Sequence, residues 1–299
     1  MHSTLVIFLD GVGIGKSDPS INPFFKYGFK SFTQVFDSIP HLENQKISKD
    51  GKFLFPSDPL MGVPDLPLSG TGQTSIFCGL NASRILGKHF GPFPHSMLVP
   101  IIREQNIFKC FKKKKKKVTF ANAYPKIFFD YIESGKKRLS VTSLSCQLSD
   151  VKLKTPTDLR SGNALSADID NEFWVKKLNY NLPLIKPETA ARRLLKLASN
   201  SHFTLFEYFL TDHLGHGRNI ENLEDRLHVL DNFLLYLLEN LPDNYTLLIC
   251  SDHGNIEDLS RKTHTLNPSL TISAGKYAAR LKDRITNLSH IKDAILELY

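Results

Sequence analysis

The sequence predicts an α/β fold in which a mostly parallel sheet lies between layers of helices. Short apolar runs with the composition of buried strands occur at residues 5–9, 203–210 and 246–250. The second run is followed by a long amphipathic segment, where apolar residues recur every three or four positions from Ile220 to Leu241. Strands that alternate with helices are typical of a parallel sheet, because each parallel pair needs a crossover connection.

The other segments continue this pattern along the chain. Residues 17–68 are rich in Pro, Ser, Asp and Phe, which predicts surface loops with one short helix near Phe29 to Phe36. Residues 76–86 predict a helix that is opened by the small hydroxyl residues before them. A helix is also expected at 187–198, where proline stands in the first turn. The last expected elements are a strand at 269–273 and a helix at 291–298.

The middle of the chain differs from the rest in its pattern of apolar and turn residues, which predicts a second, smaller unit. Residues 89–186 contain several apolar segments and many turn residues, but no predicted strand that ends in a pair of ligand residues. We therefore expect an inserted α+β cap at 89–186, and a catalytic core formed by residues 1–88 and 187–299.

Charge and cysteine usage limit the classes of partner. The formal net charge is +8, and six of these charges come from the run Lys112 to Lys117, so the rest of the chain is nearly balanced. Such a run predicts a solvated loop or hairpin tip, and a nucleic-acid partner is not expected. The four cysteines are far apart and predict reduced thiols, and no segment is long enough for a signal peptide or a membrane span. These features predict a cytoplasmic protein without a membrane partner.

Acidic residues follow three of the predicted strands, and imidazoles stand close to two of them. Open α/β sheets bind ligands beyond the carboxyl ends of their strands, so these side chains are expected to converge. Mixed carboxylate and imidazole ligation suits zinc or manganese, and the number of ligands suits two cations. The candidate ligands are Asp10, Asp212, His216, Asp252, His253 and His264, with the hydroxyl of Thr71.

Two glycine-containing segments allow more than one interpretation. The glycines after Asp10 resemble a dinucleotide fingerprint, but a carboxylate there would repel a pyrophosphate unless a cation lay between them. Thr71 lies near a predicted helix N-terminus, where a hydroxyl is well placed to attack phosphorus. The simpler alternative is that this hydroxyl only caps the helix.

The motifs LDGVGIG, PD followed by SGTGQTS, TDHLGHG, SDHGNIED and HTLNP resemble, in this order, those of the alkaline phosphatase superfamily. Within it the chain looks most similar to the cofactor-independent phosphoglycerate mutases and phosphopentomutases, over residues 1–88 and 187–275. The resemblance implies that Asp10, Thr71, Asp252 and His253 hold one metal ion, and that Asp212, His216 and His264 hold the other. It also implies that Thr71 is the nucleophile, with Thr74 as a rival one helical turn later.

The activity implied is two-metal phosphoryl transfer through phosphothreonine, by a phosphomonoester hydrolase or a phosphomutase, on a small phosphorylated metabolite. The chain is much shorter than phosphoglycerate mutases and shows no counterpart of their substrate-binding arginines, so hydrolysis is the simpler outcome. Sulfatase activity is disfavoured because no CxPxR-type motif surrounds Thr71. The alternatives are a phosphodiesterase and a catalytically silent metal-binding protein. Candidate substrate contacts in the cap are His95, Arg160 and Asp168, and His213 is expected outside the ligand set.

Overall fold

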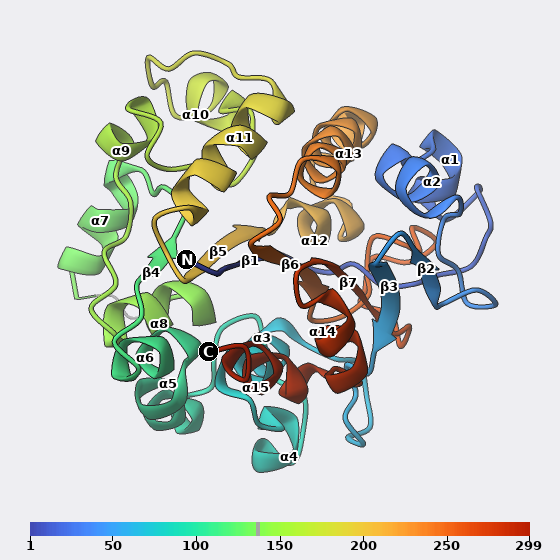
Figure 1. Cartoon of the computed structure of the whole chain (residues 1–299), viewed down its shortest axis with the longest axis horizontal. Coiled ribbons are helices and arrows are strands. Elements are labelled where there is room, and N and C mark those ends of the chain that lie inside the picture. Colours follow the sequence, from blue (N-terminus) through green and yellow to red (C-terminus); the bar gives the residue numbers. More distant parts are fainter. Residues whose placement is uncertain (136–137) are drawn as a thin grey trace.

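The centre of the fold is a seven-stranded mixed sheet, seen in a computed structural model that describes residues 1–135 and 138–299 (Figure 1). Neighbouring strands follow the order β2-β3-β7-β6-β1-β5-β4. The strands are β1 Ser3–Leu9, β2 Ile47–Lys49, β3 Lys52–Ser57, β4 Val118–Phe120, β5 Phe203–Tyr208, β6 Tyr245–Ser251 and β7 Ser269–Gly275.

The sheet divides into a parallel and an antiparallel half. Strands β4, β5, β1 and β6 pair in parallel, whereas β7, β3 and β2 each pair antiparallel to a neighbour. The predicted α/β class is confirmed, and the prediction of a mostly parallel sheet is right only for the first four strands. The chain returns from β6 to β7 through the loop of residues 252–268 without a crossover helix, so β7 runs antiparallel.

Strands β2 and β3 lie in the segment for which the sequence analysis predicts surface loops. They form a hairpin whose two-residue turn is Asp50-Gly51, and both turn residues have positive φ, 48° and 72°. An Asp-Gly turn of this kind matches the twist of paired strands and is a hairpin signal in itself. The prediction of loops is therefore wrong for residues 47–57.

Helices cover both faces of the sheet (Figure 1). Successive residues of β1 point to opposite faces, with Leu5, Ile7 and Leu9 in one hydrophobic cluster and Val6 and Phe8 in the other. The first cluster is covered by α1 Pro23–Tyr27, α2 Lys30–Phe36, α11 Pro187–Ala198, α12 Leu210–Gly215 and α13 Leu223–Glu239. The second is covered by α3 Ser69–Cys78, α4 Ala82–Leu86, α5 Val99–Gln105, α6 Ile107–Lys113, α8 Val141–Leu148, α14 Ala278–Arg284 and α15 Ile291–Leu296.

The segment expected to form a cap is in part built into this core. Strand β4 pairs with β5, and the buried side chains of α5, α6 and α8 belong to the second cluster. A separate small cluster, which includes Leu159, Trp174 and Leu182, lies in the later part of the segment. The division into core and cap stays a prediction. The remaining elements are α7 Lys126–Glu133, α9 Pro156–Arg160, α10 Glu172–Lys176 and the 3-10 turns Ser96–Leu98, Ile220–Asn222 and Leu288–His290.

The predicted helices are confirmed at 187–198 and, with shorter bounds, near both 220–241 and 291–298. The helix expected at 76–86 is wrong in its bounds. Helix α3 begins at Ser69 and ends at Cys78, because Gly79 adopts φ +68° and donates its N–H to the Ser75 carbonyl. The small hydroxyl residues therefore lie inside α3 rather than before it.

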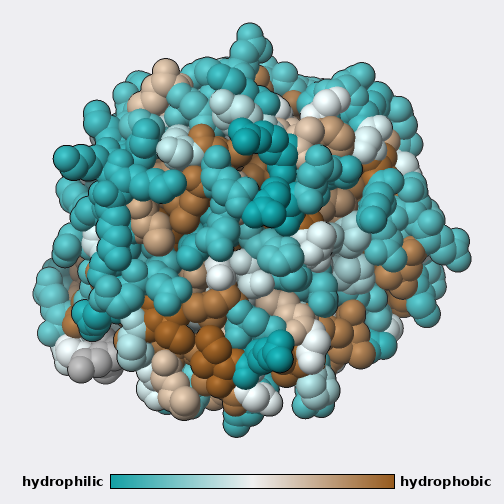
Figure 2. All heavy atoms as spheres, turned by 60° about the horizontal axis from the view of Figure 1, so that its bottom comes forward, coloured by the Kyte–Doolittle hydropathy of each residue, from teal (hydrophilic) through white to brown (hydrophobic). Residues whose placement is uncertain are grey.

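The surface is mostly hydrophilic on the face that carries the lower helices of Figure 1, and apolar side chains gather there in smaller patches (Figure 2). The lysine run ends α6 and leads into β4, and five of its six residues are exposed, as predicted for a solvated segment. Within the described part of the chain, no helix combines the length and apolar character that crossing a membrane requires.

Candidate metal centre

Three aspartates lie together where the central strands end. Asp10 follows β1, Asp252 follows β6, and Asp212 stands in the first turn of α12, shortly after β5. Strand β1 pairs in parallel with β5 on one side and with β6 on the other, so all three residues reach the same edge of the sheet. The turn after Asp10 needs glycine at position 11, since its φ is +70° and a Cβ there would lie 2.9 Å from Oδ1 of Asp212.

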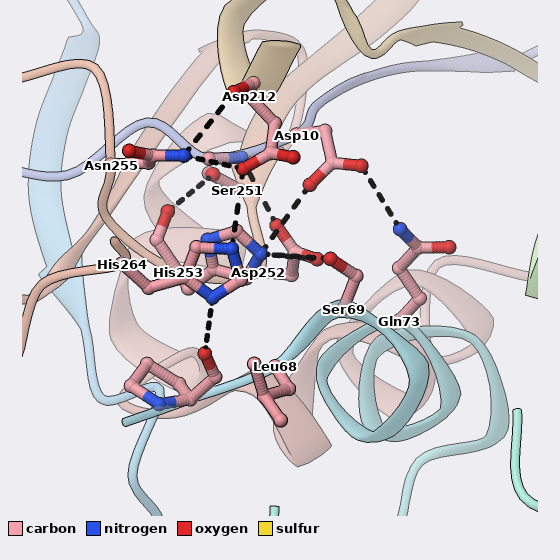
Figure 3. A network of polar contacts seen from close by, with 12 residues as sticks. Asp10, Leu68, Ser69, Gln73, Asp212, Ser251, Asp252, His253, Asn255 and His264 are labelled. Atoms are coloured by element: carbon pink, nitrogen blue, oxygen red, sulfur yellow. Dashed lines mark hydrogen bonds and ion pairs between the residues drawn. The ribbon is translucent and has the colours of Figure 1, made fainter. Parts of the chain in front are cut away.

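The first group of polar side chains consists of Asp10, Ser69, Asp252 and His253, which point toward one another in Figure 3. Nε2 of His253 lies 3.4 Å from Oδ1 of Asp10, 3.5 Å from Oδ2 of Asp252 and 3.0 Å from Oγ of Ser69. All four residues are buried. Oδ1 of Asp10 and Oδ2 of Asp252 have no hydrogen-bond partner among the described residues. Buried carboxylate oxygens without a donor are costly unless a cation faces them.

The second group consists of Asp212, His216 and His264. The Nε2 atoms of the two histidines lie 3.1 Å apart, and Oδ1 of Asp212 lies 3.4 Å from that of His216 and 3.3 Å from that of His264. Nδ1 of His264 donates to the Pro67 carbonyl at 2.6 Å, and Nδ1 of His216 donates to the Lys262 carbonyl at 2.7 Å. A carbonyl oxygen only accepts, so each Nε2 directs its lone pair toward the group. Metal-binding histidines are held in this way.

The two groups are contiguous. The rings of His253 and His264 stack with their centroids 3.7 Å apart, and one ligand atom from each of Asp212, His253 and His264 lies within 4.8 Å of the others. Their donor atoms also have the spacing of a coordination shell. Bonds of about 2.0–2.2 Å in a tetrahedral site place neighbouring ligand atoms about 3.3–3.6 Å apart, and the distances in both groups are 3.0–3.5 Å. Each group therefore fits one divalent cation.

Burial and mutual repulsion set the protonation of these side chains. Burial and the neighbouring carboxylates raise the pKa of Asp10, and burial with the Asp212 charge raises the pKa of Asp252 to about 7. Burial lowers the pKa of His253 to about 3, so this imidazole is neutral and free to act as a ligand. Burial alone would raise the pKa of Asp212, but its hydrogen bond with His264 and nearby imidazoles lower it. Burial would lower the pKa of His264, but in the absence of a cation the Asp212 carboxylate beside it raises that pKa.

Buried polar residues behind the candidate ligands fix the loop that carries three of them. The Glu257 carboxylate accepts from the N–H of Gly13 at 2.9 Å, the N–H of Asn255 at 2.8 Å and the hydroxyl of Thr265 at 2.5 Å. A Cβ at position 254 would lie 2.2 Å from both Oε1 of Glu257 and Oγ1 of Thr265, so only glycine fits there.

Two amide side chains orient the aspartates, and sequence reasoning identified neither. Asn255 donates to Oδ1 of Asp212 at 2.6 Å, and Gln73 donates to Oδ2 of Asp10 at 3.3 Å. Asn255 lies in the SDHGNIED motif and Gln73 in SGTGQTS, so motif membership was the available signal.

The hydroxyl that the structure brings to the first group belongs to Ser69. Ser69 is the first residue of α3, and its Oγ faces Nε2 of His253. The Thr71 hydroxyl instead donates to the Leu68 carbonyl at 3.0 Å, and the Thr74 hydroxyl donates to the Gly70 carbonyl at 2.6 Å. The structure thus places both threonine hydroxyls against backbone carbonyls of the helix region, in contrast to the role expected for Thr71.

The other candidates lie outside the two groups. His95 accepts from the Met97 N–H and packs edge-on against the Phe90 ring. Asp168 accepts from the Phe173 N–H at 2.5 Å, which anchors the start of α10. Arg160 is exposed at the end of α9, and the His213 ring lies against Phe209 with centroids 5.2 Å apart. The structure shows local roles for these residues and no contact with the metal-ligand groups.

Comparison with known proteins agrees with this geometry. The model of the Metalloenzyme superfamily matches residues 176–298, which include five of the six candidate Asp and His ligands. A 2,3-bisphosphoglycerate-independent phosphoglycerate mutase of Ehrlichia ruminantium is 31% identical over 102 residues, 31% of this chain and 20% of that protein. A phosphopentomutase of Helicobacter pylori is 38% identical over 63 residues, 21% of this chain and 15% of that protein. The chain thus matches about a fifth or less of the length of these curated relatives.

The fold as a whole has a counterpart among solved structures. The alkaline phosphatase of the Antarctic bacterium TAB5 superposes with a TM-score of 0.57 at 13% identity, over 99% of this chain and 97% of that one. This likeness extends the shared fold beyond the segments that match in sequence. Over residues 176–298 the chain is similar to the Metalloenzyme superfamily, and its fold is that of an alkaline phosphatase.

Proposed function

We propose that this chain is a two-metal phosphoryl-transfer enzyme that acts on a small phosphorylated compound and carries the phosphoryl group on Ser69. The observation that carries the proposal is the 3.0 Å contact between Oγ of Ser69 and Nε2 of His253, within a buried group of carboxylate and imidazole ligands. The hydroxyl of Thr71, by contrast, donates its hydrogen bond to the Leu68 carbonyl.

The residues present supply the parts that this chemistry needs. Asp10, Asp252 and His253 would hold one cation, and the Asp212 group would hold the other, with zinc or manganese as the suitable metals. When bound, the cations would lower the pKa of the nucleophilic hydroxyl and offset the charge of the phosphate. Helix α3 begins at Ser69, and the positive end of its dipole favours an anion at the same point.

The reaction consists of two displacements at phosphorus. Oγ of Ser69 forms a new P–O bond while the ester P–O bond breaks, and the alcohol leaves with a proton. In the second displacement water attacks the phosphoserine, which yields inorganic phosphate and restores the serine. Attack by a second hydroxyl of the same substrate would instead produce an isomer. The names of the sequence relatives favour a mutase, whereas the lack of a recognised arginine clamp favours hydrolysis, which we propose as the basal activity.

The test compares Ser69→Ala with Thr71→Ala, using phosphomonoesters, phosphodiesters and sugar phosphates with manganese and zinc. Ser69→Ala should lower kcat by at least about 10³-fold, because a nucleophile is lost. Thr71→Ala should retain kcat within about tenfold and lose about 1–2 kcal/mol of stability, because one buried hydrogen bond is lost.

Mass spectrometry of acid-quenched wild-type enzyme should locate the phosphoryl group at position 69. An active Ser69→Ala variant together with an inactive Thr71→Ala variant would return the nucleophile to Thr71. Metal content without turnover of any phosphoester would indicate a metal-binding protein that is not an enzyme.

A further inference from the structure

A groove of about 470 Å³ lies at the outer edge of the sheet, between the start of β4 and the segment after α8. β4 is the last strand of the sheet, so its outer edge has no partner strand among the described residues. Five of the groove's lining residues are lysines: Lys112, Lys116, Lys117, Lys152 and Lys154.

The protein balances the positive charge of this groove only in part, through Asp150 in the lining and through Asp158, whose pKa the charges of Lys152 and Lys154 help to lower. None of the five lysines forms an ion pair with a carboxylate of the described chain, whereas Lys109 lies 3.0 Å from Glu104 and Lys49 lies 2.7 Å from Asp37. Asp150 is the one acidic residue in the lining.

One of the lysines is held in place by the wall of the groove. Nζ of Lys112 donates to the carbonyls of Ser149 at 2.7 Å and Asp150 at 3.4 Å. These contacts fix the ammonium group without neutralising it. Clustered like charges repel one another, and an anion bound among them would relieve that repulsion.

The groove is distinct from the metal centre. The groove is lined by β4 itself, by lysines before β4 and by residues 150–154 and 200–201 before β5, whereas Asp10, Asp212 and Asp252 follow the ends of β1, β5 and β6. Because these strands are parallel, the groove lies at their amino ends and the metal-ligand groups lie at their carboxyl ends. The two ends are separated by roughly 20 Å, the length of a six-residue strand. In Figure 1 the β4 edge lies at the left of the sheet, beside α6.

Volume and lining identify the class of ligand. A volume of 470 Å³ lies within the range of pockets for small molecules. The aromatic residue in the lining, Phe120, is fully buried beneath the groove, so it offers no exposed ring on which a nucleic-acid base could stack. We propose that this groove binds a small polyanion that carries three or more phosphate or carboxylate groups.

The lysines also have a simpler explanation, which the experiment must separate from binding. Lysines beside an open edge strand discourage pairing with another chain. In that case they would create a diffuse positive surface without a saturable site.

The test measures binding of tripolyphosphate to the full chain by titration calorimetry, after metal has been removed with a chelator and the chelator has been removed by dialysis, since metal-free enzyme does not consume the probe. Two triple variants remove the same number of charges from the same run. Lys112→Gln/Lys116→Gln/Lys117→Gln changes lysines that line the groove, and Lys113→Gln/Lys114→Gln/Lys115→Gln changes lysines outside its lining. We expect saturable 1:1 binding that weakens at least about tenfold in the first variant and less than about threefold in the second.

A double variant of the opposite wall, Lys152→Gln/Lys154→Gln, should weaken binding in the same way and guards against misfolding of the first variant. Equal losses in the two triple variants, or the absence of saturation in the wild type, would overturn the proposal. Tighter binding of a twelve-residue oligothymidylate through the same lysines would also overturn it in favour of a nucleic-acid surface.

Discussion

The two ends of the parallel strands carry charged side chains in different environments, which are enclosed at the carboxyl ends and open to solvent at the amino ends. At the carboxyl ends, the carboxylates and imidazoles are buried or half-buried, and hydrogen bonds with backbone carbonyls and amide side chains fix their orientation. At the amino ends, lysines from two segments of the chain line an open groove, and they are exposed or half-exposed. Burial makes each charge at the carboxyl ends depend on its partners, whereas the lysines need no partner to remain stable.

The comparison predicts different consequences of removing charge at each end. At the carboxyl ends, a substitution should change metal binding, activity and the pH dependence of stability together, because the groups share one enclosed space. At the amino ends, a substitution should change ligand binding and leave folding nearly unchanged.

The largest effect is expected for Asp252→Asn. Asp252 is fully buried, and its Oδ2 has no hydrogen-bond partner among the described residues, so a neutral amide there would be a much weaker cation ligand than the carboxylate. The variant should lose at least one metal equivalent by elemental analysis and at least about 10³-fold in phosphatase kcat. The exposed Asp243→Asn serves as the control with the same change of charge. Full metal content in Asp252→Asn would contradict the assignment of this edge as a metal centre.

An intermediate effect is expected for Glu207, a buried residue of β5 that accepts a hydrogen bond from Thr142 at 2.6 Å. Burial raises the pKa of its carboxyl from 4.5 to about 7. The folded state therefore holds this proton more tightly, and the stabilisation present below pH 4.5 is lost as the pH rises toward 7. The loss is on the order of 3 kcal/mol for such a shift.

Glu207→Gln should remove this pH dependence, because an amide does not titrate. Urea unfolding in EDTA between pH 4.5 and 8 should show the variant gaining stability over the wild type as the pH rises. Glu43→Gln, at an exposed position, should follow the wild-type curve. A constant difference between Glu207→Gln and the wild type across this range would contradict the prediction.

The smallest effect is expected at the amino ends. Lys113→Gln/Lys114→Gln/Lys115→Gln should change the free energy of unfolding by less than about 0.5 kcal/mol, because these side chains are exposed. Any gain should disappear as salt screens the remaining charges. Urea unfolding at low and high salt measures both quantities, and a loss above about 2 kcal/mol would show that the run is structural.

Local sequence patterns predicted much of the fold. The buried strands β1, β5 and β6, the helix α11 and the convergence of Asp10, Asp212 and Asp252 at one sheet edge follow from apolar periodicity and strand order. The hairpin of β2 and β3 was missed although its Asp-Gly turn is a recognised signal, because β2 has only three residues and β3 contains a proline.

Sequence patterns alone do not identify the reactive hydroxyl. Ser69, Thr71 and Thr74 lie within six residues of one another, and composition alone does not distinguish them. Their roles depend on where α3 begins, since a shift of a few residues rotates each hydroxyl to another side of the helix. Only packed against Asp10 and His253 does Ser69 face the ligands.

The sequence by itself determined which residue types end the central strands, and hence that carboxylates and imidazoles gather at one edge. Tertiary structure decided which hydroxyl joins them, which amides orient them and which lysines line a groove at the amino ends of the strands. The physical reason is that strand and helix periodicity is encoded in neighbouring residues, whereas the direction of a buried polar side chain is set by partners that the chain brings from far away.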